Sequence, residues 1–327
     1  MKFGFEVPVN FKRYNACDMN GVLIIDKPSR RTSYDIIRDV KKLLGTKKVG
    51  HAGTLDPLAT GVLTICINEG TKLSQFLAND DKQYRVTMLL GVRTDTLDTD
   101  GQVIERCEPC LQTEEITDVI RSFAGSIKQR APRYSAVKFN GKPLYKWTRQ
   151  GVDIEPPLRN VEIYQIEVEE VNIPHVIFSV SCSKGTYIRS LCADIGDRLG
   201  CGACVSDLRR TVSGSFSETD AISLETFADA KKTGGLEQYL VSMADALPAV
   251  PSILIDQDTA DRIRTGYQPV HSVFTSENTP LLKEGDLVKF VTKDSVLIAV
   301  AKMFFSSENV SLLNNGEQAT KTLRVFN

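Results

Sequence analysis

Apolar residues near the start of the chain follow two different spacings. Residues 22–25 form an unbroken apolar run, and residues 62–67 form an apolar run interrupted only by Thr64, a pattern typical of buried strands. Between them, apolar residues recur every three or four positions from Ser33 to Leu44, and Gly45 then supplies a helix stop. The N-terminal part is therefore predicted to fold as a strand, a helix and a second strand.

The rest of the chain continues this mixture of strands and helices. Tyr84 to Leu90 alternates in polarity and predicts a strand with one buried face. Because the predicted strands and helices are interleaved irregularly, the pattern favours an α+β fold over regular βαβ units. The other predicted elements are helices at 114–123 and 186–199 and strands at 161–171, 176–181 and 208–212.

The pattern changes after two prolines, Pro248 and Pro251. Short apolar stretches at 286–291, 295–302 and 322–326 predict a small β-rich module. We therefore divide the chain into an N-terminal extension, a large domain and a small C-terminal domain, with bounds of 1–18, 19–250 and 251–327.

The composition is that of an ordinary folded protein, with 42% hydrophobic and 25% charged residues. Neither a signal-peptide core nor a run of about 18 apolar residues occurs, so we expect a cytoplasmic protein with no membrane contact. Its eight cysteines are then expected to be reduced thiols. Two CxxC pairs, Cys107/Cys110 and Cys201/Cys204, lie about 90 residues apart, whereas a zinc ribbon separates its pairs by roughly 15–20. Incidental thiols are therefore favoured over a metal site.

Two segments are strongly basic although the net charge is only −1. Residues 27–48 hold eight basic and two acidic residues, and residues 128–149 hold seven basic residues and no acidic one. The second segment also contains four aromatic residues, Tyr134, Phe139, Tyr145 and Trp147. Basic groups neutralise phosphates and aromatic faces stack on unpaired bases, so this segment indicates RNA binding. A solvated loop with hydrophobic anchors is the alternative.

Common catalytic motifs are missing from the sequence. No GxGxxG follows a predicted strand, and no GxxxxGK[ST] or GxSxG occurs. The three histidines are far apart and form no HExxH. The sequence therefore gives no reason to invoke a metal or a nucleotide cofactor.

Three residues remain as candidates for chemistry. Asp56 lies in the glycine-rich stretch Gly50–Leu63, on a connection that enters a strand, where reactive groups are often displayed; an ordinary Asp-Pro turn is the alternative. Tyr84 begins a strand, where a core aromatic is the usual explanation. Arg189 falls in the first turn of a predicted helix, where the helix dipole disfavours a cation, so we expect it to pair with a carboxylate elsewhere.

Seven short motifs taken together resemble one family. In order and spacing they are similar to the TruB-type tRNA pseudouridine synthases, and the Gly-His-x-Gly-x-Leu-Asp-Pro segment is the most specific of them. The C-terminal module is similar to the PUA-like β-barrel of that family. The motifs are residues 19–28, 50–61, 84–86, 91–96, 134–138, 183–189 and 208–210.

The resemblance implies a pseudouridine synthase fold, with a mixed, largely antiparallel sheet and flanking helices. It also implies isomerisation of uridine to pseudouridine at position 55, in the T loop of tRNA, with the target nucleotide flipped into a pocket. No cofactor is implied, because the atoms that are removed are put back. No obligate protein partner is implied either. The alternatives are a guide-RNA-dependent relative and an RNA-binding protein whose catalytic site is vestigial.

The family's residue roles map onto this sequence one by one. Asp56 would be the catalytic aspartate, acting as a nucleophile or as a base toward the ribose, and Arg189 would keep it ionised through an ion pair. Tyr84 would stack on the target base and is a candidate for removing the C5 proton. Tyr187 and Leu208 would line the base pocket, His51 would contact the T loop, Lys138 and Arg149 would bind RNA, and Lys27, Pro28, Gly53 and Pro57 would support the active-site turn.

Overall fold

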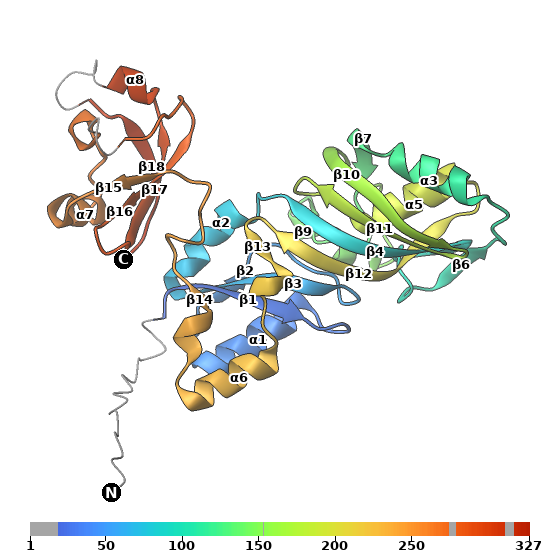
Figure 1. Ribbon diagram of the computed structural model, residues 1–327. Coiled ribbons are helices and arrows are strands. Elements are labelled where there is room, and N and C mark those ends of the chain that lie inside the picture. The colour runs from blue at the N-terminus through green and yellow to red at the C-terminus, as the bar shows by residue number, and fades with distance from the viewer. Residues whose placement is uncertain (1–18, 153, 275–278, 311–316) are drawn as a thin grey trace, which may run out of the picture.

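The computed structural model describes residues 19–152, 154–274, 279–310 and 317–327, and the predicted extension 1–18 lies outside this range. The chain forms a long body built on one large sheet and a smaller β module at one end (Figure 1). No helix in the described part of the chain is long and apolar enough to cross a membrane.

The large sheet of the described residues has ten strands, eight of them in the order β14-β1-β3-β12-β4-β11-β10-β7, with β13 and β2 paired to β12 and β3. Its pairings are antiparallel except that β12 runs parallel to β3. The mixed, largely antiparallel sheet confirms the predicted α+β fold. Its strands are β1 (Gly21–Lys27), β2 (Val49–His51), β3 (Thr60–Ile67), β4 (Lys82–Leu90), β7 (Gly125–Arg130), β10 (Leu158–Asn172), β11 (His175–Cys182), β12 (Ala203–Ser213), β13 (Phe216–Ser217) and β14 (Leu240–Val241).

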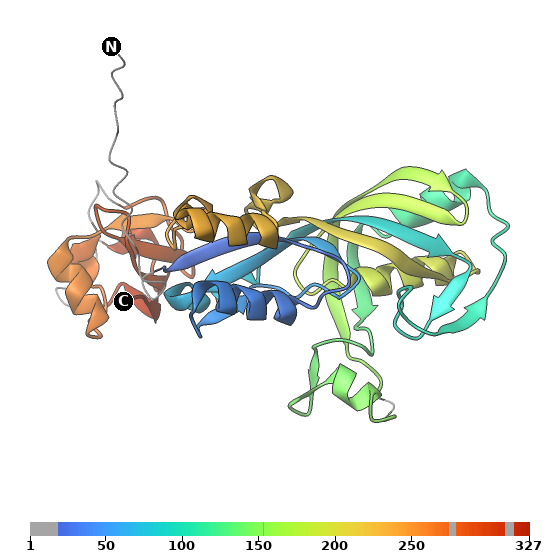
Figure 2. The ribbon, with the colours of Figure 1, turned by 90° about the horizontal axis from the view of Figure 1, so that it is seen from below.

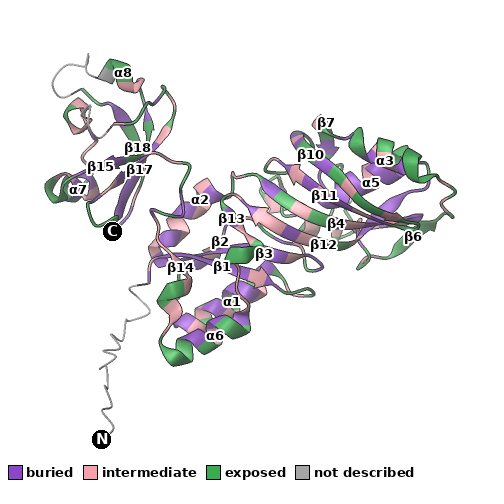
Figure 3. Cartoon of the chain, viewed as in Figure 1, coloured by how far each residue is buried: buried purple, intermediate pink, exposed green. Residues whose placement is uncertain are grey.

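Two pairs of helices cover the sheet. Helices α1 (Ser33–Leu44) and α6 (Leu224–Thr233) lie together at one half, and α3 (Thr113–Arg121) and α5 (Ile188–Arg198) lie together at the other (Figures 1 and 2). Their inner faces are buried and the outer faces of α3 and α6 are exposed (Figure 3). The spacing of apolar residues in each helix therefore predicts which of its faces packs against the sheet.

Helix α1 has the bounds that its sequence predicts. Thr32 caps its first turn through a capping box with Asp35, and Gly45 ends it with a left-handed φ of 69°. Helix α5 begins two residues later than predicted, because Tyr187 still has extended backbone as its N-cap.

Several elements were not predicted. Strand β7 has few buried positions, since it is a sheet edge that pairs with β10, and its sequence GSIKQR contains one strongly apolar residue. Helix α6 carries a weak apolar stripe. The remaining short elements are α2 (Ser74–Leu77), β5 (Val92–Thr94), β6 (Val103–Arg106), β8 (Lys138–Phe139), β9 (Lys142–Pro143), α4 (Leu144–Thr148), and 3-10 turns at Asn68–Leu73, Glu218–Asp220, Leu236–Tyr239 and His271–Val273.

The C-terminal module contains the three predicted strands and one more. Its sheet has the order β15-β16-β17-β18 and packs over α7 around its own apolar core. A second apolar cluster joins Val300 and Phe326 of the module to Val22 of β1, so the module is packed against the large sheet. The elements are β15 (Ser252–Leu254), α7 (Gln257–Arg264), β16 (Leu287–Val291), β17 (Leu297–Met303), α8 (Ser307–Val310) and β18 (Thr320–Val325).

Candidate active site

Asp56 lies on a turn between β2 and β3 that is held from one side by the end of β1. The Lys27 ammonium is fully buried and donates to the carbonyl of Pro57 at 3.2 Å and to that of Arg31 at 2.6 Å. The backbone N–H of Arg30 donates to the same Pro57 carbonyl at 2.8 Å. Burial lowers the pKa of Lys27 from 10.5 to about 8, and the Asp56 charge opposes this effect. Lys27 therefore supports the Asp56 turn from behind.

Arg210 of β12 holds the other side of the turn. Its side chain is almost fully buried, and it donates from Nε to the Val62 carbonyl at 2.7 Å and from Nη2 to the Gly53 carbonyl at 3.2 Å. Gly53 has a φ of +95°, which favours glycine, and a Cβ there would stand 3.6 Å from Nη1 of Arg210. Gly61 is more restricted, because its Cβ would stand 2.2 Å from the Arg210 carbonyl oxygen.

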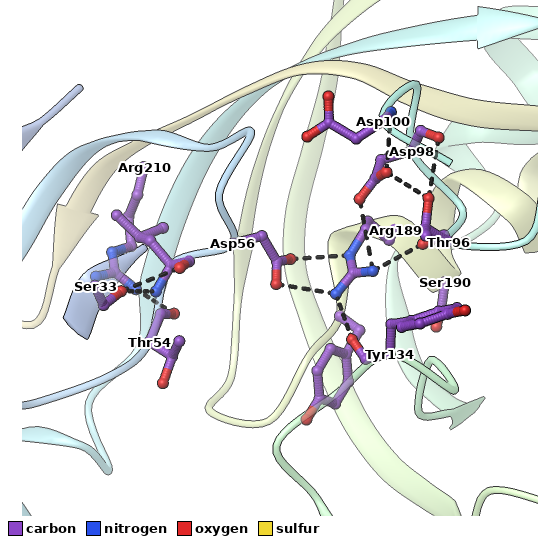
Figure 4. A network of polar contacts seen from close by, with 12 residues as sticks. Ser33, Thr54, Asp56, Thr96, Asp98, Asp100, Tyr134, Arg189, Ser190 and Arg210 are labelled. Atoms are coloured by element: carbon purple, nitrogen blue, oxygen red, sulfur yellow. Dashed lines mark hydrogen bonds and ion pairs between the residues drawn. The ribbon is translucent and has the colours of Figure 1, made fainter. Parts of the chain in front are cut away.

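The carboxylate of Asp56 forms a two-bond ion pair with Arg189. Arg189 donates from Nε to Oδ2 and from Nη2 to Oδ1, both at 2.9 Å (Figure 4). It also donates to the carbonyls of Thr96 at 2.7 Å and Tyr134 at 3.0 Å, and only 6% of its side chain is exposed. Four oxygen contacts therefore fix the guanidinium, and an ionised Asp56 meets a bidentate partner. Asp56 is thus the carboxylate that the sequence analysis expected as a partner for Arg189 in the first turn of α5.

Asp98 is a second carboxylate beside Arg189, and sequence reasoning missed it. Its Oδ2 lies 3.6 Å from Nη1 of Arg189, and its Oδ1 accepts a 2.5 Å hydrogen bond from the Thr96 hydroxyl. Burial raises the pKa of Asp98, while the Thr96 hydroxyl and Arg189 oppose the rise. The sequence signal was weak: Asp98 follows the 91–96 motif by two residues, and only the fold brings it to α5.

A pocket of about 240 Å³ opens beside Asp56, and we call it the Asp56 pocket. It brings together Tyr84, Tyr187 and Leu208, which sequence reasoning assigned to a base site, with Asp56 itself. His51, Lys138 and Arg149 are not part of its lining. The lining residues are Gly53, Thr54, Leu55, Asp56, Ala78, Lys82, Tyr84, Ser135, Ala136, Ser183, Gly185, Thr186, Tyr187, Ile188, Leu208 and Arg210.

The two tyrosines of the Asp56 pocket are uncharged at neutral pH. Loss of solvation raises the pKa of Tyr84, and the Arg210 charge opposes the rise. Burial likewise raises the pKa of Tyr187. Tyr187 is fixed by Gln129, which donates to its carbonyl at 3.0 Å and accepts from its N–H at 2.8 Å. Both phenols are therefore suited to stacking and hydrogen bonding rather than to acting as free bases.

His51 ends β2 outside the Asp56 pocket. It is half-buried, and its Nδ1 has no hydrogen-bond partner among the described residues. Burial, with a smaller effect from Arg210, lowers the pKa of His51, so the imidazole is neutral at pH 7. A buried nitrogen without a hydrogen-bond partner is uncommon in folded proteins.

Residues 128–149, which we call the basic arm, begin at the end of β7, and the part that contains β8, β9 and α4 projects from the body as a small lobe (Figure 2). Lys138 and Arg149 are both exposed on it. Two of its aromatic rings are covered by its own cations, with Lys142 4.1 Å from the Trp147 ring centre and Arg149 5.5 Å from that of Tyr145. In the free protein these two faces are therefore occupied, which the sequence pattern did not predict.

The two CxxC pairs have different surroundings. Cys107 and Cys110 are exposed, Cys201 and Cys204 are buried, and the cysteines within the described ranges are free thiols. Over those same ranges, no three histidine, cysteine or acidic side chains gather in a way that could hold a metal ion.

Two family models match this chain. "TruB family pseudouridylate synthase (N terminal domain)" matches residues 41–188, and "tRNA pseudouridylate synthase B C-terminal domain" matches residues 189–247. A protein of Syntrophus aciditrophicus (strain SB) named tRNA pseudouridine synthase B is 49% identical over 94% of this chain and 99% of that protein. The chain belongs to the TruB family of pseudouridylate synthases. This confirms the resemblance inferred from the motifs and makes the protein an isomerase.

Other relatives agree with this assignment to the TruB family. A tRNA pseudouridine synthase B of Geobacter sulfurreducens (strain ATCC 51573 / DSM 12127 / PCA) is 38% identical over 94% of this chain and 100% of that protein. The crystal structure of a Cbf5-Nop10-Gar1 complex contains a chain of 30% identity and TM-score 0.74, covering 94% of this chain and 85% of that one. An H/ACA RNP bound to a substrate RNA containing 2'-deoxyuridine gives 28% identity and TM-score 0.74, covering 95% and 86%. These similarities confirm the predicted fold class.

Proposed function

We propose that the protein converts uridine to pseudouridine at position 55, in the T loop of tRNA, and that Asp56 starts the reaction. The observation that carries this proposal is the bidentate Asp56–Arg189 pair at the wall of a pocket that also contains Tyr84 and Leu208. A stacked base in a folded loop cannot reach a carboxylate in a pocket, so the target nucleotide must flip into the pocket.

Asp56 has two possible first steps, and in each of them the bond that forms is matched by one that breaks. It attacks C1′ of the ribose, so that an ester forms as the C1′–N1 bond breaks; otherwise it takes the 2′ proton, so that a C1′–C2′ double bond forms as the base leaves. In both routes the uracil turns and rejoins through C5, and a proton is lost from C5. Arg189 holds the Asp56 carboxylate in place for either step through two hydrogen bonds.

Tyr84 is proposed to stack on the target base, with Tyr187 and Leu208 closing the pocket around it. Because burial raises the pKa of Tyr84, removal of the C5 proton by this phenol requires a relay to a stronger base. The supporting residues Lys27, Pro28, Gly53 and Pro57 act through the shape of the Asp56 turn.

The RNA is proposed to bind over the basic arm and around His51. Lys138 and Arg149 supply exposed positive charge for phosphates, and the shape of the T arm supplies selectivity. We assign residues 251–327 to a PUA-like RNA-binding domain and propose that the enzyme works in the cytoplasm without a cofactor or an obligate protein partner.

Mapping of pseudouridine in an unmodified tRNA transcript tests this proposal. Purified protein should produce one pseudouridine, at position 55, without any added protein or guide RNA, and a transcript with cytidine at that position should stay unmodified. Modification that requires a guide RNA would favour the guide-dependent alternative. Tight tRNA binding with no pseudouridine at all would favour a vestigial site.

A further inference from the structure

The Asp56 pocket contains two buried cations whose hydrogen bonds end on backbone carbonyls. Lys82 is 7% exposed and Arg210 is 1% exposed, and both line the pocket. Lys82 donates from Nζ to the carbonyl of Ala78 at 3.0 Å and to that of Asp80. The bonds of Arg210 likewise end on backbone carbonyls. Within the described residues neither side chain forms an ion pair, in contrast to Arg189.

Both side chains approach Gly53 in the pocket wall. A Cβ on Gly53 would stand 3.6 Å from Nη1 of Arg210 and 4.0 Å from Cε of Lys82. Burial is the main cause that lowers the pKa of Lys82, repulsion from Arg210 adds to it, and the charges of Asp80 and Asp81 oppose it. Two buried cations whose hydrogen bonds end on carbonyl oxygens are costly to fold, because each loses hydration that these oxygens replace only in part.

The reaction proposed above creates a negative charge in this pocket. Whichever first step Asp56 takes, the electron pair of the C1′–N1 bond leaves with the uracil, whose negative charge then spreads over N1 and the two ring carbonyl oxygens. Fixed positive charge in a site that excludes water stabilises such a charge strongly, because the site needs no reorganisation as the charge develops.

We propose that Lys82, assisted by Arg210, stabilises the uracil as it departs from C1′ as an anion. An ammonium has three N–H donors, and the two carbonyl contacts leave one of them for a uracil oxygen. This inference rests on the proposed function and extends it, since it gives the pocket a group that acts on the base while Asp56 acts on the ribose.

The test compares Lys82→Met with a matched control. Lys289 is also buried, at 6% exposure, and its ammonium also donates to two backbone carbonyls, those of Ala244 at 2.7 Å and Leu247 at 2.8 Å, but it lies in the C-terminal module. Lys82→Met and Lys289→Met therefore remove the same kind of structural contact, and only Lys82→Met removes charge from the pocket.

Single-turnover pseudouridine formation on tRNA is measured for the full-length chain and both variants, together with the tRNA dissociation constant. Lys82→Met should slow the chemical step about 10- to 100-fold with the dissociation constant unchanged, and Lys289→Met should keep the wild-type rate. If Lys82→Met does not fold, Lys82→Gln replaces it, since the amide still donates hydrogen bonds without the charge. A folded Lys82 variant with the wild-type rate overturns the proposal, and so does an equal loss in Lys289→Met.

A second measurement separates charge stabilisation from positioning. Fluorine at C5 of the target uridine withdraws electrons, so the departing base needs less help from the protein. The ratio of wild-type to variant rates for N-glycosidic cleavage should therefore shrink on the fluorinated tRNA; an unchanged ratio contradicts the proposal. A wild-type enzyme that makes no pseudouridine in unmodified tRNA would instead refute the proposed function itself.

Discussion

Arg189, which pairs with Asp56, and Arg149 on the basic arm carry the same guanidinium group in opposite surroundings. Arg189 is buried and its donors are committed to Asp56 and to two backbone carbonyls before any substrate arrives. Arg149 is exposed and touches the ring of a neighbouring tyrosine. A buried, paired charge is set in place during folding, whereas an exposed charge acts when a polyanion approaches. The two regions should therefore respond differently to mutation, salt and pH.

The two regions are nevertheless connected. Tyr134 belongs to the basic arm, and its carbonyl accepts a hydrogen bond from Arg189 at 3.0 Å. Tyr187 packs against the small apolar core of the arm, with Val137 and Leu144. Binding of RNA to the arm and the geometry at Asp56 are thus linked through a few named contacts.

Apart from loss of Asp56 itself, the largest expected effect comes from Arg189→Ala. This change leaves Asp56 without its bidentate partner in a half-buried site, so pseudouridine formation should fall by about 1,000-fold or more, and unfolding in urea should show a loss of about 3–5 kcal/mol. Single-turnover rates and urea denaturation measure the two effects.

A neighbouring arginine provides the control for that change. Arg209 also makes a bidentate pair with a carboxylate, Asp26, at 3.0 and 3.1 Å, but both side chains are about one-third exposed. Arg209→Ala should cost within about 1 kcal/mol and leave the rate intact. Equal losses in both variants would mean that Arg189 is only a structural residue.

Asp98→Asn should have a smaller effect than loss of Arg189. The amide keeps the volume and the hydrogen bond with Thr96, but it removes the second negative charge facing Arg189. We expect a loss of about tenfold in the chemical rate, because Arg189 keeps its two bonds to Asp56. An unchanged rate would remove Asp98 from the catalytic arrangement.

Changes on the basic arm should affect binding and not chemistry. Lys138→Ala or Arg149→Ala should weaken tRNA binding severalfold and reduce the slope of log affinity against log salt by about one unit, with the rate at saturating tRNA unchanged. Binding titrations at several salt concentrations measure this slope. An unaltered slope would show that the arm faces away from the RNA.

The smallest expected effect concerns Asp194, which lies on α5 but outside the Asp56 pocket. Burial, and then the charge of Asp197, raise its pKa from 3.8 to about 6. The folded state thus holds a proton that the unfolded state releases, so stability falls as pH rises from about 4 to 6. Asp194→Asn should stabilise the protein by about 1 kcal/mol at pH 7 and leave it unchanged at pH 3.5. Urea denaturation measures the free energy of unfolding of the wild type and of the variant at both pH values. An equal gain in stability at pH 7 and pH 3.5 would contradict this expectation.

The sequence alone predicts those helices and strands whose apolar residues follow a regular spacing. The apolar period from Ser33 to Leu44, with its cap residues, defines α1, and short, mainly apolar runs define β1 and β3. Edge strand β7 was missed because a strand with few buried positions leaves little apolar pattern.

In the same way, some residues of the active site can be found from the sequence and others only from the fold. Asp56, Tyr84 and Arg189 lie in recognisable motifs, and their place in the chain suggested a function before the fold was known. Lys82 and Asp98 could not be found that way, because each is an ordinary charged residue until tertiary packing buries it beside Arg210 or Arg189. Burial of a charge is a property of the fold.

The central claim is that Asp56 performs the chemistry while the basic arm supplies affinity. Tritium release from tRNA that carries 5-tritiated uridine tests it most directly, because loss of the C5 hydrogen accompanies each isomerisation. The wild type should release tritium, and Asp56→Asn should bind the same tRNA with similar affinity and release none. Equal release from the two proteins would contradict the claim.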